Sequence, residues 1–375
     1  MEYYDVVIIG AGIYGIEAAL NEKMKNKKVL ILEKEEDIFL GASYTNQARL
    51  HNGYHYPRSY ETVTEVVDNF TNFSNKYKFA INSEFRSIYA IAKKGSYINA
   101  EQFEMFCDDF GLEYKKINPD LYFKPDSVEA VYETKEYVFD SQITKRYYLK
   151  KLEEHKNITI RFKSFIKTVK IENQKYLLTL NNGEIIETPY VINSTYSSVN
   201  IINKLFNQEL YKIKYQLCEM VLGKWNLNNV SVTVMDGKFF SCMPFGKNDI
   251  QTLTTVGHTP HETCYRELPE FKCQRDNEYC SSEHLGNCNL CPNKPKSRIK
   301  EMMNIYNTFI KDEYQYEYDK SLFTIKPTLV ESEKDDGRPT VVKKYRENPT
   351  FVSCLSGKFS TIYLLDKFLE EDIKE

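Results

Sequence analysis

The sequence has no long run of one charge and no long apolar segment. Its 50 lysines and arginines nearly balance 53 aspartates and glutamates, which gives a net charge of −3. This balance gives no electrostatic reason to expect a nucleic acid or an anionic membrane as partner. No stretch approaches the roughly 20 apolar residues of a membrane span, and the N-terminus lacks the profile of a signal peptide. We therefore expect a cytoplasmic protein without a transmembrane segment.

The length and the cysteine count narrow the class further. With 375 residues, of which 42% are hydrophobic, the chain is long for a single core, so we expect one large composite domain or two intimate ones. Nine cysteines is an odd number. In a reducing compartment, thiols or metal ligands are expected in place of disulfides.

The first 35 residues carry the most specific motif. An apolar strand over 4–9 leads into Gly10-Ala11-Gly12-Ile13-Tyr14-Gly15, a helix is expected over 16–25, and a second strand over 28–32 ends at Glu33. In such a motif the first glycine makes a tight turn, the second lets the backbone approach a pyrophosphate, and the third lets helix and strand pack closely. The helix N-terminus attracts the phosphates, and the acid binds a ribose. The spacing predicts a dinucleotide site.

The residues after Glu33 distinguish FAD from NAD. The segment SYTNQARLHNGYHY, residues 43–56, resembles the flavin-contacting segments of FAD-dependent oxidoreductases of the D-amino-acid oxidase superfamily, such as L-2-hydroxyglutarate and glycerol-3-phosphate dehydrogenases. The resemblance implies that this loop runs along the flavin, and that a residue near Ile166 packs on the adenine. The cofactor-binding residues expected from this half of the chain are Gly10, Gly12, Ile13, Tyr14, Gly15, Glu33, Lys34, Ser43, Asn46, Gln47, Arg49 and Ile166.

The C-terminal region carries a second resemblance to the same superfamily. Lys326-Pro327 stands where the family has Arg-Pro, and Asp336-Gly337-Arg338-Pro339 matches its Asp-Gly-x-Pro turn. SGKFST, residues 356–361, is similar to the Gly-Gly-Lys-Leu-Thr-Thr segment of glycerol-3-phosphate dehydrogenases. A helix that begins near Phe359 would direct its N–H groups to the flavin N1 and C2 carbonyl, where negative charge develops on reduction. The expected cofactor contacts here are Gly357, Lys358, Phe359 and Ser360.

The middle of the chain is expected to alternate helices and strands. Helices are predicted over 60–77, 99–110 and 141–155, and strands over 86–92 and 190–193, with a hairpin turn at 181–183. Ser194-Thr195-Tyr196 departs from the glycine-ended run that the family has after this strand. Alternating apolar segments over 212–255 predict strands of a mixed substrate-binding sheet, with a hairpin over 235–246.

The expected fold class is α/β (α+β): a Rossmann-like FAD-binding domain interleaved with a substrate domain on a mixed β-sheet. We expect residues 1–56, 135–200 and 320–375 to form the composite FAD-binding domain. Residues 57–134 and 201–319 would then form the substrate domain, including a cysteine-rich insert at 258–297.

The resemblance implies two-electron oxidation of a CH–OH or CH–NH bond in a small polar, anionic substrate, with hydride transfer to the flavin. A base near neutral pKa would accept the proton of a hydroxyl group. His51 matches the family histidine and is the first candidate, with His55 second; the alternative for either is a structural role in the loop. Expected substrate-binding residues are Tyr54, Lys326 and Arg338. Lysine at 326 lacks the bidentate fork of the family's arginine. The electron acceptor is left open between oxygen, a quinone and a protein.

The insert holds five cysteines in a polar, asparagine-rich segment. Cys288 and Cys291 have the CxxC spacing with which two thiolates hold one tetrahedral ion. Structural zinc, an iron–sulfur centre and free thiols are the alternatives. The expected ligands are Cys273, Cys280, Cys288 and Cys291, with Cys264 and His284 as alternates.

Two rival functions stay open. The same fold could serve a flavin monooxygenase-like hydroxylase, although no second glycine fingerprint for NAD(P)H is present. Alternatively, the chain could be a non-catalytic flavin and metal redox-sensing protein whose cysteine insert acts as a switch.

Overall fold

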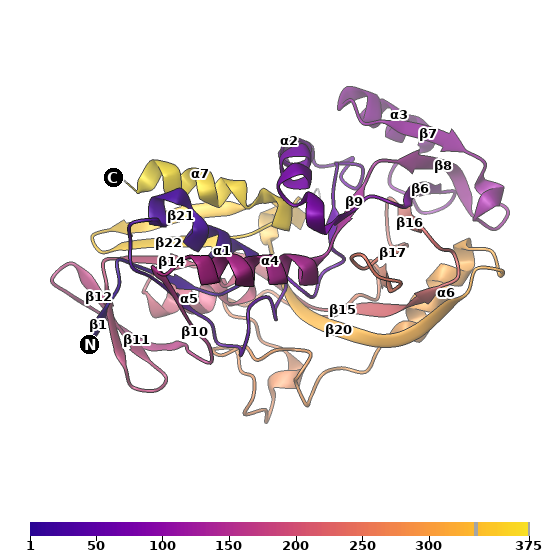
Figure 1. Cartoon of the computed structure of the whole chain (residues 1–375). Helices are drawn as coiled ribbons and strands as arrows, with labels where there is room; N and C mark the ends of the chain where they lie inside the picture. The colour runs from indigo at the N-terminus through magenta and orange to yellow at the C-terminus, as the bar shows by residue number, and fades with distance from the viewer. Residues whose placement is uncertain (334–336, 374–375) are drawn as a thin grey trace.

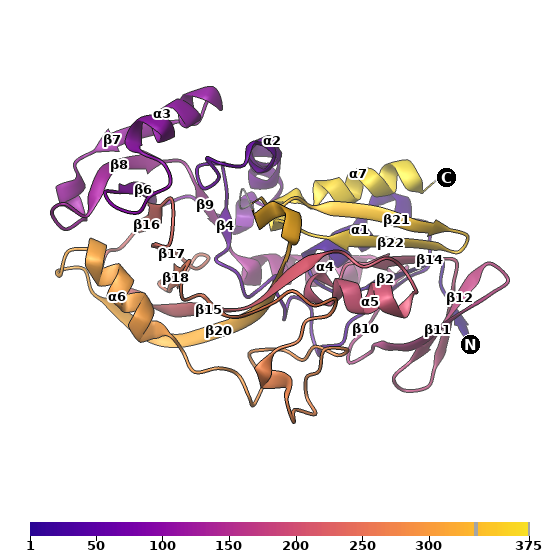
Figure 2. The same cartoon turned by 180° about the vertical axis from the view of Figure 1, so that it is seen from behind.

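The computed structural model describes residues 1–333 and 337–373. Figures 1 and 2 show two lobes joined by the long strands β15 (Ile213–Trp225) and β20 (Tyr316–Leu329), with both termini at the same end of the molecule. Asp336, part of the predicted Asp-Gly-x-Pro turn, lies outside the described residues. Within the described ranges, no helix is long and apolar enough to cross a membrane.

The first lobe is built on a six-stranded sheet. Its strands, in spatial order, are β10 (Ile158–Arg161), β3 (Val29–Leu32), β2 (Val6–Ile9), β14 (Tyr190–Asn193), β22 (Thr350–Leu355) and β21 (Val341–Glu347). The strands are parallel except β21, which runs antiparallel to β22. The central strands are apolar on both sides because β2, β3 and β14 are covered on both faces.

Four helices surround this sheet. They are α1 (Ile13–Leu20), α4 (Ser141–Glu154), α5 (Val199–Leu205) and α7 (Tyr363–Asp372). The helix predicted over 16–25 begins earlier, directly after Gly12, and ends at Leu20. Asn21 then starts a short 3-10 turn, Glu22–Met24, by accepting a hydrogen bond from the Lys23 N–H. A small sheet of β1 (Glu2–Tyr3), β13 (Ile185–Thr188), β12 (Lys175–Leu180) and β11 (Ile166–Glu172) lies beside it, with the predicted hairpin between β12 and β13.

The second lobe is built on a nine-stranded mixed sheet, as predicted. In spatial order it contains β19 (Pro260–Cys264), β15, β18 (Gln251–Thr255), β17 (Phe240–Pro244), β16 (Val230–Met235), β6 (Arg86–Ala92), β8 (Val128–Thr134) and β7 (Tyr114–Ile117), while β20 pairs with β15. Strands β16 and β6 are parallel, and the other pairs are antiparallel. Helix α6 (Ile299–Phe309) buries Met302 and Tyr306 against this sheet, and α3 (Ala100–Asp109) buries Phe103.

The pairing of β20 differs from the predicted domain boundary at residue 320. The whole of β20, from Tyr316 to Leu329, follows β15 of the large sheet. The segment that returns to the first sheet therefore begins after Leu329. The division into domains is otherwise a proposal that the strand order supports.

Helix α2 (Tyr60–Lys76) and three short strands connect the lobes. The strands are β4 (Arg49–Leu50), β9 (Tyr137–Phe139) and β5 (Ile81–Asn82). Phe70 and Phe73 of α2 belong to the same apolar cluster as Ile16 of α1 and Tyr148 of α4. The remaining short turns of 3-10 type are Lys78–Ala80, Pro119–Leu121, Tyr196–Ser198, Lys272–Gln274, Val330–Glu333 and Phe359–Thr361.

A buried carboxylate joins three of these helices. Glu17 of α1, only 6% exposed, accepts hydrogen bonds from the hydroxyl groups of Tyr77 and Tyr148 and pairs with Lys76 Nζ at 2.5 Å. The two tyrosine hydroxyls are themselves 2.6 Å apart. Glu17 therefore fixes α1, which begins at the glycine turn, against α2 and α4.

We expect Glu17→Ala to lower the free energy of unfolding by roughly 2–4 kcal/mol, because two buried hydroxyl groups lose their acceptor. Glu17→Gln keeps one acceptor oxygen and should lose less. Chemical denaturation followed by circular dichroism measures both, with the exposed Glu61→Ala on α2 as control. Equal midpoints for Glu17→Ala and Glu61→Ala would contradict this role.

Candidate active site

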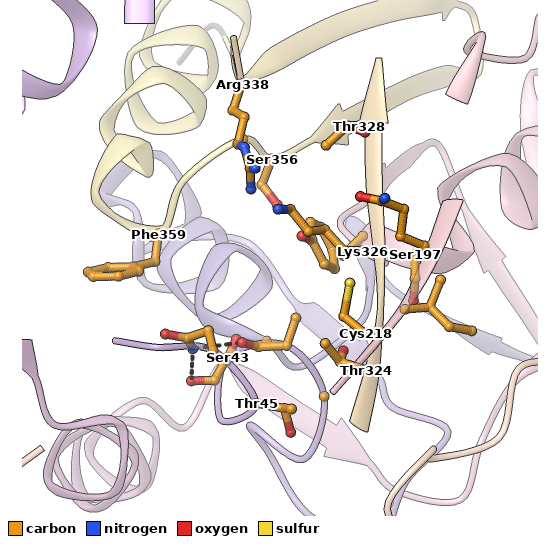
Figure 3. Close-up of a pocket in the computed structure, with 18 of the residues that line it drawn as sticks. Ser43, Thr45, Ser197, Cys218, Thr324, Lys326, Thr328, Arg338, Ser356 and Phe359 are labelled. Carbon is orange, nitrogen blue, oxygen red and sulfur yellow. Dashed lines mark hydrogen bonds between the residues drawn. The ribbon is translucent and has the colours of Figure 1, made fainter. Parts of the chain in front are cut away.

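A cavity of about 1260 Å³ lies between the two lobes. It is lined by the turn after β2, the loop at residues 39–49, strands β15 and β20, and the C-terminal return at 356–359. Figure 3 shows Ser43, Lys326, Arg338 and Phe359 around this space, contributed by segments distant in the sequence. Such a volume exceeds that of most small-ligand pockets and suits a dinucleotide together with a substrate.

The glycine turn has the geometry that its motif predicts. Gly10 has a φ of +100°, which favours glycine, and Gly12 precedes α1 without a side chain that caps the helix. A Cβ on Gly15 would lie 1.9 Å from the Gly10 carbonyl oxygen. Gly15 therefore does not line the cavity, and its role is the close packing of helix and turn.

Glu33 holds this turn in addition to facing the cavity. Its Oε2 accepts from the Ala11 N–H at 2.7 Å and its Oε1 accepts from the Glu35 N–H at 2.9 Å. Burial raises the pKa of Glu33, while both N–H groups act in the opposite direction. A carboxylate retains further lone pairs, so it can still accept from a ribose hydroxyl.

The loop at residues 41–48 is fastened by its own polar side chains. Ser43 Oγ accepts from the Ile13 N–H at 3.0 Å. Asn46 donates to the carbonyls of Ala42 and Ser43 and accepts from the Ala48 N–H. Gln47 Nε2 is buried and makes no hydrogen bond with the protein. Ser43, Asn46 and Gln47 all line the cavity, and their contact with the cofactor stays a prediction.

The C-terminal return closes the cavity from the other side. The Tyr14 hydroxyl donates to the Lys358 carbonyl at 2.6 Å and lies 2.9 Å from Thr361 Oγ1, which ties α1 to this segment. Gly357, Lys358 and Phe359 line the cavity, whereas Ser360 is buried behind it. The predicted helix is a 3-10 turn over Phe359–Thr361, and α7 begins only at Tyr363.

Residues 194–196, after β14, form their turn without the glycine that the family has there. Ser194 Oγ donates to the Ile9 carbonyl at 2.9 Å, and Tyr196 adopts a φ of +53°. Both residues line the cavity. Burial raises the pKa of Tyr196 to about 12, although Arg338 acts in the opposite direction.

The two predicted histidines lie together in the cavity wall. Their rings are 5.5 Å apart, and the Tyr56 hydroxyl is 3.2 Å from His51 Nε2. His51 Nδ1 lies 3.4 Å from Glu136 Oε1, yet neither His51 Nδ1 nor His55 Nδ1 makes a hydrogen bond with the protein. Burial lowers the pKa of both imidazoles well below 6.5, so both are neutral at pH 7.

The pKa of His51 also reports the positive charges around it. After burial, the causes of its lowering are Lys358, Arg49, Arg338 and Lys326, in that order. Burial and Arg49 lower the pKa of Lys358 to about 7, and its ammonium lies 4.0 Å from the centre of the Tyr56 ring. Four basic side chains thus lower the pKa of one imidazole.

Arg49 is committed to protein partners. Its guanidinium donates to the Tyr89 hydroxyl at 2.6 Å, to Glu136 Oε2 at 3.3 Å and to Ser241 Oγ. Tyr89 also donates to Glu136 at 2.6 Å. Arg49 lines the cavity, but most of its donors serve this buried network.

Of the predicted substrate contacts, Lys326 and Arg338 line the cavity and Tyr54 does not. In Figure 3 the side chains of Lys326 and Arg338 extend into the same space, near Cys218. Tyr54 is fully buried in the apolar cluster beneath α3, and its hydroxyl donates to the Glu113 carbonyl at 2.5 Å. The prediction for Tyr54 is corrected because Gly53, at φ +110°, turns the chain so that His55 and Tyr56 face the cavity instead.

The cavity fits FAD on several observations. It has room for a dinucleotide, the start of α1 carries no side-chain cap, and Gln47 Nε2 and His55 Nδ1 are buried nitrogens without a hydrogen-bond partner in the protein. Ile166, the residue expected at the adenine, also lines it, 7% exposed.

Comparison with known proteins agrees with this geometry. Residues 5–277 match the family described as FAD dependent oxidoreductase. The chain belongs to this family. It is therefore an FAD-dependent oxidoreductase, and it falls within the D-amino-acid oxidase superfamily that the sequence resembles.

Among solved structures, glycine oxidase from Geobacillus kaustophilus superposes with a TM-score of 0.71 at 12% identity, covering 100% of this chain and 95% of that one. L-alpha-glycerophosphate oxidase from Mycoplasma pneumoniae with FAD bound also gives 0.71, at 14% identity, with 100% and 94% covered. At these identities the likeness establishes the fold, and it confirms the predicted fold class.

Two curated fungal proteins are similar over shorter segments. FAD-dependent monooxygenase FPY4 of Fusarium mangiferae is 29% identical over 113 residues, 30% of this chain and 31% of that protein. FAD-dependent monooxygenase kojA of Aspergillus flavus is 35% identical over 85 residues, 23% of this chain and 20% of that protein. The matched segments thus span a third or less of these relatives.

The four cysteines predicted as metal ligands lie around one small second cavity, together with Leu217, Phe271 and Phe323. Cys264 belongs to the adjoining apolar cluster, and His284 contacts the Phe165 ring. Across residues 1–333 and 337–373, however, no three His, Cys, Asp or Glu side chains are arranged to hold a metal ion. Burial raises the pKa of Cys273 to about 11 and that of Cys288 to about 12. A metal at these thiols therefore stays a prediction without geometric support.

Sequence reasoning missed Glu136, which contacts Arg49, His51 and Tyr89 from the short connection between β8 and β9. No local motif marks it, because its partners come from three distant segments. The sequence shows only a glutamate directly before the apolar segment that forms β9.

We expect Gly12→Val to abolish FAD binding, because a Cβ there would lie 3.1 Å from Ser43 Oγ and the larger side chain would occupy the turn's cavity face. The ratio of flavin to protein absorbance in purified protein measures this. Gly257→Ala, where a Cβ meets no atom within 4 Å, is the control. A flavin-replete Gly12→Val would show that the turn does not hold the cofactor.

Proposed function

We propose that this chain oxidises a CH–OH or CH–NH bond of a small anionic substrate by two electrons. The observation that carries the proposal is a single cavity wall that presents the His51 imidazole together with four basic side chains, Lys326, Arg338, Lys358 and Arg49. Bound FAD supplies the two-electron chemistry by accepting a hydride equivalent. The chain's own residues then have to bind the anion, orient it and accept a proton.

His51 is the proposed proton acceptor. A neutral imidazole carries a proton on one nitrogen and accepts at the other. Nδ1 faces Glu136 at 3.4 Å, which favours the tautomer with the proton on that atom and leaves Nε2 as the accepting atom. Tyr56, 3.2 Å from Nε2, would orient the ring until a substrate hydroxyl takes its place.

Lys326 and Arg338 are the proposed anion-binding groups. Lys326 extends from β20 and Arg338 from the segment before β21, so the two side chains approach the cavity from different segments. An arginine fork and a lysine point charge suit a carboxylate or phosphate of a small molecule. Arg49 is less suited because its donors are engaged with Glu136, Tyr89 and Ser241.

The electron acceptor is part of the proposal and not of the established family assignment. Oxygen, a quinone and a protein are the candidates. An anaerobic screen of hydroxy acids, amino acids and phosphorylated alcohols, followed by bleaching of the flavin absorbance, tests the substrate class directly. Adding oxygen or a soluble quinone to the reduced protein then distinguishes the acceptors by their rates of reoxidation. Failure of all anionic substrates, with bleaching by a neutral or cationic one, would overturn the proposal.

A hydroxylase is the second candidate, favoured by the names of the two fungal relatives. It requires NAD(P)H or another reductant to reduce the flavin before the substrate reacts. Reduction by NAD(P)H alone, in the absence of any oxidisable substrate, would favour it. A purely redox-sensing protein would show no steady turnover with any small molecule.

We expect His51→Gln to slow single-turnover flavin reduction by an alcohol substrate by roughly 10²–10⁴-fold, the usual contribution of a general base. Because burial lowers the pKa of His51 well below 6.5, the imidazole is neutral at pH 7, and the wild-type rate should fall only at pH values well below 6.5. His55→Asn is the comparator. A flavin-replete His51→Gln that reacts at the wild-type rate at every pH would exclude this base, and loss of FAD would assign His51 a structural role.

We expect Lys326→Met to raise KM for an anionic substrate by roughly 10- to 100-fold, since a hydrogen bond to a charged group is lost. Lys320→Met, on the exposed part of the same strand and outside the cavity, is the matched control. Steady-state kinetics with a substrate and its uncharged amide or ester measure the effect. An equal change for charged and uncharged forms would show that Lys326 does not bind the anion.

A further inference from the structure

The cysteine-rich insert forms part of the wall of the dinucleotide cavity. It runs as an irregular segment at the bottom of Figures 1 and 2, between β19 and α6. Seven consecutive residues of this segment, 283–289, line the large cavity; the last six of them are His284, Leu285, Gly286, Asn287, Cys288 and Asn289. The family match ends at residue 277, so these residues lie beyond it.

One end of this six-residue segment contacts the side of the cavity where the adenosine is expected. Lys34 directly follows Glu33 in the sequence, and its Nζ donates to the Leu285 carbonyl at 2.5 Å. The His284 ring lies 4.6 Å from the ring of Phe165, the neighbour of Ile166. Both contacts therefore involve residues adjacent to the predicted ribose and adenine positions.

The other end contacts the loop that fastens the glycine turn. Asn287 Nδ2 donates to the Leu40 carbonyl at 3.2 Å, and Asn289 Nδ2 donates to Thr45 Oγ1 at 3.2 Å. Asn289 Oδ1 also accepts from the Phe323 N–H of β20 at 2.7 Å. Asn289 thus bridges the cofactor loop and the large sheet.

The segment has a firm apolar base. Leu285 and Cys280 are buried in a cluster with Leu217, Phe271 and Ile325 of the second lobe. Cys288 lines both the large cavity and the small cysteine cavity, so it separates the two. The Asn287 N–H donates to the Tyr279 hydroxyl at 3.0 Å. This anchoring explains how a polar insert can keep a fixed position over the cavity.

We propose that residues 284–289 form an additional FAD-binding wall, a clasp that covers the cavity from the adenosine end to the cofactor loop. The clasp holds the dinucleotide by positioning Lys34 and the loop at residues 41–48, and FAD must pass it to leave. The cysteines and apolar side chains around the small cavity support the clasp. The inference depends on FAD binding, which the family assignment gives, and not on the identity of the substrate.

The first test is FAD affinity. Asn289→Ala removes the two hydrogen bonds by which Asn289 joins Thr45 to β20. We expect this loss to raise the Kd for FAD about tenfold, because FAD would be released faster. Asn293→Ala, in the same insert but lining neither cavity, is the matched control. Fluorescence titration of cofactor-free protein and stopped-flow release from the holoprotein give the two values. Equal Kd values for both variants would overturn the proposal.

The second test does not depend on a variant that folds. Alkylation of intact protein, read residue by residue by mass spectrometry, compares Cys288 with Cys273, which lines only the small cavity. Bound FAD should slow alkylation of Cys288 several-fold more than that of Cys273. General stabilisation by FAD would protect both thiols equally, and that result would contradict a clasp against the cofactor.

Discussion

The site depends on a half-buried carboxylate that holds a glycine turn. Glu33 accepts from the backbone N–H groups of Ala11 and Glu35, at 2.7 and 2.9 Å. This charged acceptor fixes the end of β3 to the turn after β2, so the start of α1 is held open toward the cavity. Burial alone would favour the protonated form of Glu33, and the two N–H donors offset this tendency. The same residue therefore shapes the turn and presents a polar edge to the ribose position, which explains why an acid and not merely a polar side chain stands there.

From this turn, α1 connects the two ends of the cofactor site. Glu17 in its middle is bound by Tyr77 and Tyr148, and Tyr14 in its first turn binds the Lys358 carbonyl at 2.6 Å. A displacement of α1 would thus move both the predicted pyrophosphate position and the segment at residues 357–359. The N-terminal and C-terminal motifs are more than 300 residues apart, yet a single hydroxyl group joins them. The coupling is a property of packing that neither motif reveals by itself.

The sequence predicted the elements that depend on neighbouring residues better than the contacts between segments that are distant in the sequence. Strands β2, β3, β6 and β14 and helices α2, α3 and α4 were predicted within about three residues, because apolar periodicity and caps such as Asp140 are local signals. The cofactor loop could be proposed from the sequence because its glycine, serine and asparagine follow the fingerprint directly, and its residues line the cavity. The pairing of β20 with β15 and the contact of Glu136 with Arg49 could not be predicted, because each joins segments that only the folded chain brings together. Tyr54 was misassigned for a related reason: a positive φ at Gly53 decides which neighbouring aromatic faces the cavity.

The electrostatics of the cavity connect cofactor, base and substrate. Lys358 is buried beside Arg49, and its pKa of about 7 reflects how unfavourable a further positive charge is in this place. An anion that enters the cavity would reverse this effect by stabilising the charged ammonium, so that Lys358 takes up a proton when the anion binds. Burial first, and then the same cations, lower the pKa of His51, so its imidazole is neutral and has one nitrogen able to accept a proton. Under the proposed function, this cluster of positive charge would attract the anionic substrate and favour the reduced cofactor, while Glu136 holds Arg49 and faces the His51 ring of the proposed base.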